Sequence, residues 1–268
     1  MGAIVVDSYL IVILTAATLI ALTAGALGPY ALLRRYALLS DALSHASMLG
    51  AVVGAVVGAG NLMLSALLCV IVAAGLEYLR MRGRLQADAL LAALIAASLA
   101  ASVTIASLGK LGTAGLMGLL FGSLATVKSD DLLPIAGVCL VVLGVMAYYY
   151  HECAKIVFDE ESALVEGVAV TRINLIMISL LALFVSVAIS VVGALMISAL
   201  LVFSALSALQ AGKDFASSII LSALLAVVGS WAGVGLSWFY PIPVGPAIVL
   251  SMAVIFGCSL LLRRRRAL

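Results

Sequence analysis

The sequence is poor in charge. Only 10% of its 268 residues are Asp, Glu, Lys or Arg, and only two are histidine. A soluble globular domain carries roughly 25% charged residues, so the composition excludes that class. The hydrophobic fraction is 66%, and apolar runs near the spanning length of about 20 residues recur without a polar block long enough to fold separately. We therefore predict an integral membrane protein with one transmembrane domain, residues 1–268.

Cysteine motifs and a nucleotide-binding loop are absent. Cys69, Cys139, Cys153 and Cys258 are scattered without CxxC spacing, which favours small buried apolar side chains over a disulfide or metal framework. No GxxxxGKS or GxxxxGKT motif occurs, so the chain cannot hold ATP phosphates in the usual loop. We predict that the chain is not an enzyme and that any ATP hydrolysis belongs to another polypeptide.

Basic clusters orient the predicted spans. Arginines at 263–266 and in the cluster 80–84 favour the cytoplasmic side of a cell membrane. Counting back from a cytoplasmic C-terminus places the short turn 211–214 inside as well. The apolar stretch 175–209 is too long for one crossing, and Gly193 is the expected point of reversal on the outer side.

The count gives eight or nine crossings, because the glycine-rich segment 108–127 is either re-entrant or surface-lying. Nine crossings would leave the N-terminus outside. The run 8–33 lacks the flanks of a signal peptide and is expected to be a retained span. Gly50, Gly54 and Gly58 are spaced for close helix packing. The predicted fold class is an all-α, multi-pass helical bundle.

Asp41 and His45 are the most informative polar residues, because charge inside an apolar span is costly and usually functional. Their spacing of four places both on one face of a helix. Counted from the arginines at 34 and 35, the pair is expected in the inner half of the membrane, reaching its midplane and facing a polar path.

Three roles are open for this pair. Asp41 could orient the imidazole in a structural hydrogen bond, or His45 could relay protons. A carboxylate with an imidazole also suits zinc, manganese or ferrous iron better than magnesium or calcium. Two copies of the chain around a central pore would supply two His and two Asp, enough for tetrahedral coordination.

The longest polar loop, 151–174, contains a predicted short helix. Asp159 is a good N-cap, Glu160 and Glu161 favour the positive helix end, and Gly167 suits a left-handed stop. So short a helix needs a surface to pack on. That surface is either a cytoplasmic partner or the chain's own transmembrane domain.

Other polar residues have plainer interpretations. Glu77 and Asp88 lie at predicted span ends next to arginines and are expected to be solvated. Ser204, Ser207 and Gln210 either line a path or form hydrogen bonds between helices.

Five segments in order resemble the permeases of ATP-binding cassette (ABC) importers for manganese, zinc and iron. They are RRYALLSDALSHA (34–46), LFGSLATVKSDDL (120–132), FDEE (158–161), VVGALMISALLV (191–202) and PVG (243–245). The resemblance implies a type II ABC importer-like fold, homodimeric with a central pore. It also implies cytoplasmic ATP-binding subunits and an extracytoplasmic metal-binding solute-binding protein as partners, besides membrane lipid and a second copy, with no nucleic acid.

The resemblance implies residue roles as well. Asp41 and His45 would be ligands of transported Zn²⁺ or Mn²⁺, with Fe²⁺ as a further candidate and no permanently bound cofactor. The segment 159–167 would be the helix that couples to the ATPase, with contacts from Asp159, Glu160, Glu161, Ala163, Leu164 and Gly167.

The sequence departs from the family pattern at three positions. Leu49 and Ser204 stand where proline is usual, and Pro241 stands where aspartate is common. Helix bends along the pore are therefore expected to differ. Two other functions stay open: a proton-coupled secondary transporter that uses His45, and an ABC permease for metal chelates such as siderophores or cobalamin.

Overall fold

The computed structural model describes residues 2–58, 61–81, 87–109, 129–212 and 214–266. Their backbone is helical apart from short connections, and this part of the chain contains no strand. The helices are α1 (Gly2–Leu33), α2 (Ala37–Val57), α3 (Asn61–Met81), α4 (Ala87–Leu108), α6 (Ser129–Tyr148), α7 (Tyr150–Phe158), α8 (Glu160–Val165), α9 (Val170–Val192), α10 (Ala194–Ala211), α11 (Phe215–Phe239) and α12 (Val244–Arg266).

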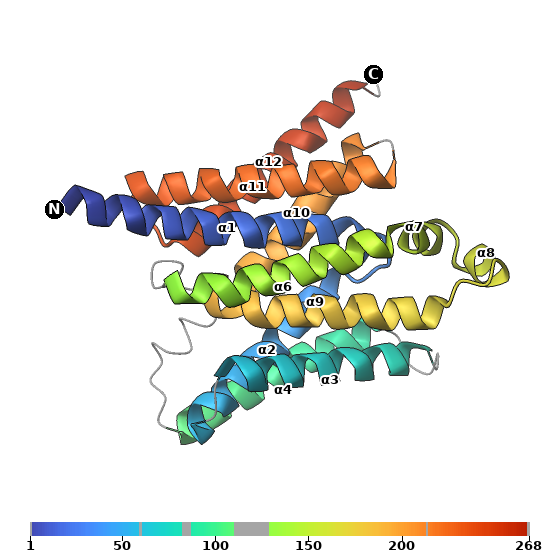
Figure 1. Cartoon of the computed structure of the whole chain (residues 1–268), viewed down its shortest axis with the longest axis horizontal. Coiled ribbons are helices and arrows are strands. Elements are labelled where there is room, and N and C mark those ends of the chain that lie inside the picture. Colours follow the sequence, from blue (N-terminus) through green and yellow to red (C-terminus); the bar gives the residue numbers. More distant parts are fainter. Residues whose placement is uncertain (1, 59–60, 82–86, 110–128, 213, 267–268) are drawn as a thin grey trace.

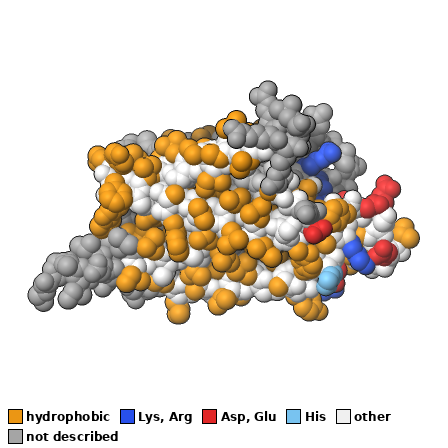
Figure 2. All heavy atoms as spheres, turned by 90° about the horizontal axis from the view of Figure 1, so that it is seen from above, with side chains coloured by type: hydrophobic (Ala, Val, Ile, Leu, Met, Phe, Trp, Pro, Cys, Tyr) orange, Lys and Arg blue, Asp and Glu red, His pale blue; other side chains and the backbone are white. Residues whose placement is uncertain are grey.

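Most helices have the length and composition of membrane spans. Within the described ranges, 8 helices are long and apolar enough to cross: α1, α2, α4, α6, α9, α10, α11 and α12. The 21-residue α3 packs beside α2 and α9. Helices are expected because the bilayer core offers no water to backbone N–H and C=O groups. Figure 2 shows apolar side chains over most of one face of the molecule. The predicted all-α transmembrane bundle is confirmed.

The helix α9 joins two groups of helices. It contacts α2 and α3 on one side and α6 on another, whereas α1 and α12 pack against α10 and α11. Figure 1 shows α9 between α6 and the group α2, α3 and α4. Large side chains of α9, such as Phe184 and Ile189, are almost completely buried. Burial of these apolar side chains therefore stabilises the packing of α9 against its neighbouring helices.

Two glycines fix the chain path as the sequence predicts. Gly193 separates α9 from α10 with a φ of +80°, which side chains other than glycine rarely adopt. The stretch 175–209 accordingly forms two helices. A Cβ atom on Gly50 would lie 2.7 Å from the Cα atom of Ser65. The helices α2 and α3 therefore pack in near backbone contact.

Long-range contacts gather several loops at one end of the bundle, called here the α8 end. Arg34 Nη1 lies 2.7 Å from Glu160 Oε2, and the stacked rings of Tyr150 and Phe215 have centroids 5.8 Å apart. The end of α1 therefore meets α8, and the start of α11 meets α7. In Figure 1 the C-terminus lies at this end and the N-terminus at the opposite end. Most of the segment 108–127 lies outside the described residues.

Candidate functional site

The first turns of α2 carry Asp41 and His45. The connection from α1 is short because Arg35 has a φ of +61° and Tyr36 N–H donates to the carbonyl of Ala31 at 2.7 Å. The chain therefore reverses at the α8 end and enters α2 at once. Asp41 and His45 follow within two helical turns, on the same face.

The two side chains point toward the same region. His45 Nε2 lies 3.8 Å from Asp41 Oδ1, which is too long for a hydrogen bond. Ser198 Oγ of α10 donates to the same Asp41 oxygen at 3.4 Å, a weak contact. Two ligands held about 2 Å from one transition-metal ion are separated by about 3–4 Å. The spacing suits a shared cation better than a closed hydrogen-bonded pair.

The two groups differ in access. The Asp41 side chain is 35% exposed, whereas that of His45 is 13% exposed. His45 Nδ1 is buried and has no hydrogen-bond partner within the part of the chain that the structure describes. The carboxylate is therefore the more accessible ligand, and no hydrogen bond fixes the imidazole tautomer. That the pair contacts a transported ion stays a prediction.

Among the described residues, Asp41 and His45 are the two candidate ligands at this site. No group of three or more His, Cys, Asp or Glu side chains that could hold a metal ion occurs among the described residues. Structural zinc takes four ligands, and open sites usually keep three from protein. The described residues alone therefore do not complete a tight metal site at Asp41 and His45.

The polar loop forms the short helix that its sequence predicts. Asp159 Oδ1 accepts the backbone N–H groups of Glu161 at 3.0 Å and of Ser162 at 3.2 Å. The Ser162 hydroxyl and these N–H groups lower the pKa of Asp159. Gly167 follows the helix with a φ of +84°. The N-cap and the left-handed stop are both confirmed, although α8 itself has only 6 residues.

One side of α8 rests on the chain's own helices. Glu160 pairs with Arg34 at 2.7 Å, and this hydrogen bond lowers the pKa of the Glu160 carboxyl. Ala163 is buried, whereas Glu161 and Leu164 are exposed and Val165 is 90% exposed. The exposed hydrophobics Phe158, Leu164 and Val165 form what we call the α8 apolar face. The helix is thus anchored on one side and exposes apolar side chains on another.

Glu77 corrects the sequence interpretation. It is not solvated: its side chain is 3% exposed, and its carboxylate accepts hydrogen bonds from Tyr36 Oη at 3.1 and 3.3 Å. Arg80 Nη1 lies 3.4 Å from the same carboxylate and also donates to the Tyr36 hydroxyl. Tyr36, which follows the arginine pair in the sequence, was the available indication that a buried polar partner was needed. The side chain of Asp88 lies outside the described residues.

Ser204 and Ser207 of α10 form hydrogen bonds to helices rather than to the candidate site. Ser204 Oγ accepts a hydrogen bond from Ser222 Oγ of α11 at 3.0 Å and donates to the carbonyl of Leu200. Ser207 Oγ donates to the carbonyl of Phe203 in its own helix at 2.7 Å. These contacts favour the interhelical hydrogen bond for Ser204 over a pore lining.

Known proteins are similar to nearly the whole chain. The pattern of the ABC 3 transport family matches residues 6–263. The chain is 28% identical over 253 residues to the manganese transport system membrane protein MntC of Halalkalibacterium halodurans, covering 94% of this chain and 86% of that protein. It is 29% identical over 242 residues to the high-affinity zinc uptake system membrane protein ZnuB of Haemophilus influenzae, covering 89% of this chain and 92% of that protein.

Solved structures share the architecture. A chain of PsaBC from Streptococcus pneumoniae, in complex with Fab, matches with a TM-score of 0.85 and 25% identity, covering 97% of this chain and 95% of that one. A structure described as an inward-facing, metal-chelate type ABC transporter matches with a TM-score of 0.68 at 20% identity and shows the fold alone. Because the family pattern spans almost every residue, the chain belongs to the ABC 3 transport family.

Proposed function

We propose that this chain is the permease subunit of an ATP-binding cassette importer that moves Zn²⁺ or Mn²⁺, with Fe²⁺ as a further candidate, across the cytoplasmic membrane by alternating access. The convergence of Asp41 and His45 on one face of α2 carries the proposal. Relatives described as manganese and zinc transport membrane proteins support the choice of metals.

The metal site would be completed by a second copy of the chain. Each copy contributes an aspartate oxygen and an imidazole nitrogen 3.8 Å apart. Two copies related by a twofold axis would place four such ligands around one ion, which is the number that tetrahedral zinc requires. Manganese would take the same oxygen and nitrogen ligands together with water or further oxygen atoms.

The α8 end would be the cytoplasmic end, where separate ATP-binding subunits dock. The arginines at 263–266 form the last turn of α12 at that end, in accord with the positive-inside rule. The α8 apolar face supplies a contact surface, and the ion pair of Glu160 with Arg34 holds that surface against the bundle. An extracytoplasmic solute-binding protein would deliver metal at the other end.

Transport in vesicles tests the proposal. The full chain is reconstituted with its ATP-binding subunits, and uptake of Zn²⁺ and Mn²⁺ is measured with and without ATP. Asp41→Asn and His45→Gln should each reduce ATP-dependent uptake at least about tenfold, since each removes one ligand. Ser44→Ala on the same helix is the matched control, because its hydroxyl bonds only to the carbonyl of Ser40.

Three results would contradict the proposal. Full uptake by both ligand variants would remove the pair from the pathway. Uptake that needs a proton gradient but no ATP would instead favour a secondary transporter, and uptake of chelates but not bare ions would favour a chelate permease.

A further inference from the structure

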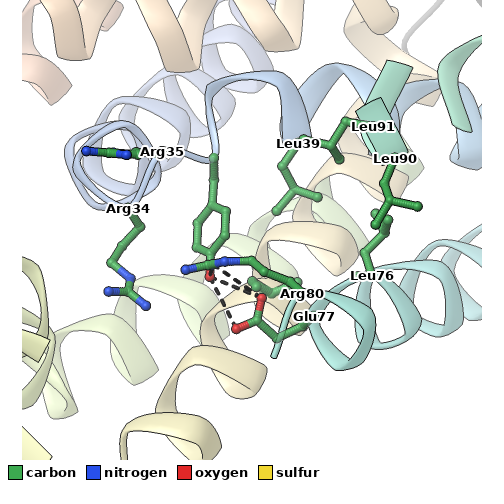
Figure 3. A pocket seen from close by; sticks show the side chains of 11 residues that line it. Arg34, Arg35, Leu39, Leu76, Glu77, Arg80, Leu90 and Leu91 are labelled. Carbon is green, nitrogen blue, oxygen red and sulfur yellow. Dashed lines mark hydrogen bonds and ion pairs between the residues drawn. The ribbon is translucent and has the colours of Figure 1, made fainter. Parts of the chain in front are cut away.

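A cavity of about 630 Å³ opens at the α8 end, apart from the proposed metal site. Its walls come from the end of α1, the start of α2, the end of α3, the start of α4 and from α9 (Figure 3). Tyr36 and Leu39 are its contributions from the α2 segment. Successive helix positions turn by about 100°, so Tyr36 and Leu39 face away from Asp41 and His45. The cavity therefore lies on the opposite side of α2 from the metal ligands.

Arg34 lines this cavity, and two of its guanidinium nitrogens lack a hydrogen-bond partner among the described residues. Its side chain is only 7% exposed, and its Nη1 is used by Glu160. Nε and Nη2 are buried and have no partner among the described residues. Burying polar groups without partners is costly. The Nε–H and Nη2–H bonds form the planar fork that binds two oxygen atoms of a carboxylate or phosphate, so the fork is suited to an anion.

Two more arginines give the cavity a positive balance. Arg34, Arg35 and Arg80 line it, against the single carboxylate of Glu77. Glu77 is already bonded by Tyr36 and Arg80, and the Arg80 guanidinium carbon lies 4.6 Å from the centre of the Tyr36 ring. Figure 3 shows Arg34 beside this cluster, while Arg35 extends away from it. The positive charge of these arginines exceeds the negative charge of Glu77 and Glu160, so the polar half of the cavity favours an anionic ligand.

The other half of the cavity is apolar. Leu39, Leu76, Leu90, Leu91 and Ile178 line it, and Figure 3 places the labelled leucines on the side away from Arg34. A free phosphate ion would leave these side chains without contacts. A phospholipid joins a phosphate to apolar chains and uses both halves. Only 22% of the span Ala89–Leu108 of α4 is buried, so much of this helix is available for contact with lipid.

We propose that this cavity binds the phosphate group of an anionic phospholipid from the leaflet at the α8 end. The Arg34 fork and the Arg80 guanidinium would hold the phosphate oxygens, and the leucines of α3 and α4 would cover the glycerol region and the upper acyl chain. Arg34 would then bond the lipid and Glu160 together. The lipid would become part of the attachment of α8 to the bundle.

Native mass spectrometry of the full chain in detergent tests this site. The probes are phosphatidylglycerol, phosphatidylcholine and inorganic phosphate, each at matched concentration. Wild-type protein should retain phosphatidylglycerol over phosphatidylcholine, and Arg34→Gln should weaken that retention about tenfold, as loss of a charged hydrogen-bond fork implies. Glu160→Gln is the matched control, because it removes the same ion pair but leaves the fork, and its retention should equal or exceed wild type.

A second variant keeps the test decisive if Arg34→Gln does not fold. Glu77→Gln combined with Arg80→Gln removes both charges of this ion pair and so leaves neither charge unpaired, and retention should again fall about tenfold because the Arg80 guanidinium is lost. Equal retention of both lipids by wild type, or undiminished retention by the folded variants, would overturn the proposal. Inorganic phosphate that displaces phosphatidylglycerol at equal concentration would overturn the lipid as the ligand.

Discussion

The ion pair between Arg34 and Glu160 makes a measurable prediction about α8. The helix has 6 residues, too few to be stable alone, so its order depends on its anchor. Hydrogen bonds to charged groups contribute about 1.5–3 kcal/mol, whereas exposed ion pairs contribute about 0–1 kcal/mol. Arg34 is 7% exposed but Glu160 is 44% exposed, which places this pair between the two cases, at about 1–2 kcal/mol.

Loss of this anchor should open α8 locally. With Glu160→Gln, amide hydrogen exchange over residues 160–165 should accelerate about 5- to 30-fold, the factor that corresponds to 1–2 kcal/mol. Glu161→Gln changes the same charge one residue away, at an exposed side chain with no ion pair to Arg34, and should leave exchange nearly unchanged. Equal acceleration in both variants would attribute the effect to charge at the helix start and refute the anchor.

The pH dependence of exchange follows from the same contact. The hydrogen bond from Arg34 lowers the pKa of Glu160 below its ordinary value of 4.5. A carboxyl group whose pKa is lower in the folded state stabilises the fold. The stabilisation is complete at pH values above the pKa of the unfolded state, and it is lost as the pH falls through the pKa of the folded state. After correction for intrinsic rates, α8 protection should therefore be constant near neutral pH and fall only below pH 4.5. A loss of protection between about pH 6 and pH 8 would contradict this assignment.

Three further predictions address packing, docking and metal. Gly50→Ala should lower the stability to denaturation by about 1–3 kcal/mol, because α3 leaves no room for the new methyl group, whereas Gly75→Ala, at an open position, should leave it unchanged or higher. Val165→Asp on the α8 apolar face should abolish co-purification with the ATP-binding subunits, while Thr171→Asp at an exposed position on α9 should not. Metal analysis of the purified protein should find one ion for two chains, and none after Asp41→Asn; one ion per chain would argue against a shared site.

Local features of the fold could be predicted from sequence because neighbouring residues determine them. The cap at Asp159, the stop at Gly167 and the break at Gly193 depend on side-chain oxygens and on φ preferences within a few positions. The membrane-spanning pattern follows from composition over about 20 residues. Tertiary packing determines where these elements lie in the bundle, but their local conformation is the one that the sequence predicts.

The burial of Glu77 could not be predicted in the same way. Its partner Tyr36 is 41 positions away, and the two meet only because α2 and α3 pack together. Viewed locally, a glutamate three residues before an arginine at a helix end is indistinguishable from a solvated pair. The Arg34–Glu160 contact spans 126 positions and was hidden for the same reason. Both sites therefore required the packing of distant helices.

The short connection between α1 and α2 has a mechanical consequence for the proposed transport cycle. Glu160 holds α8 against Arg34, and Arg35 and Tyr36 lead directly into the helix that carries Asp41. Packed helices move as rigid bodies rather than deforming continuously. A displacement of α8 by an ATP-binding subunit would therefore reach Asp41 through one ion pair and less than two turns of helix. In the proposed cycle, motion at the α8 end would thus be coupled to the position of the proposed metal ligands over a short path.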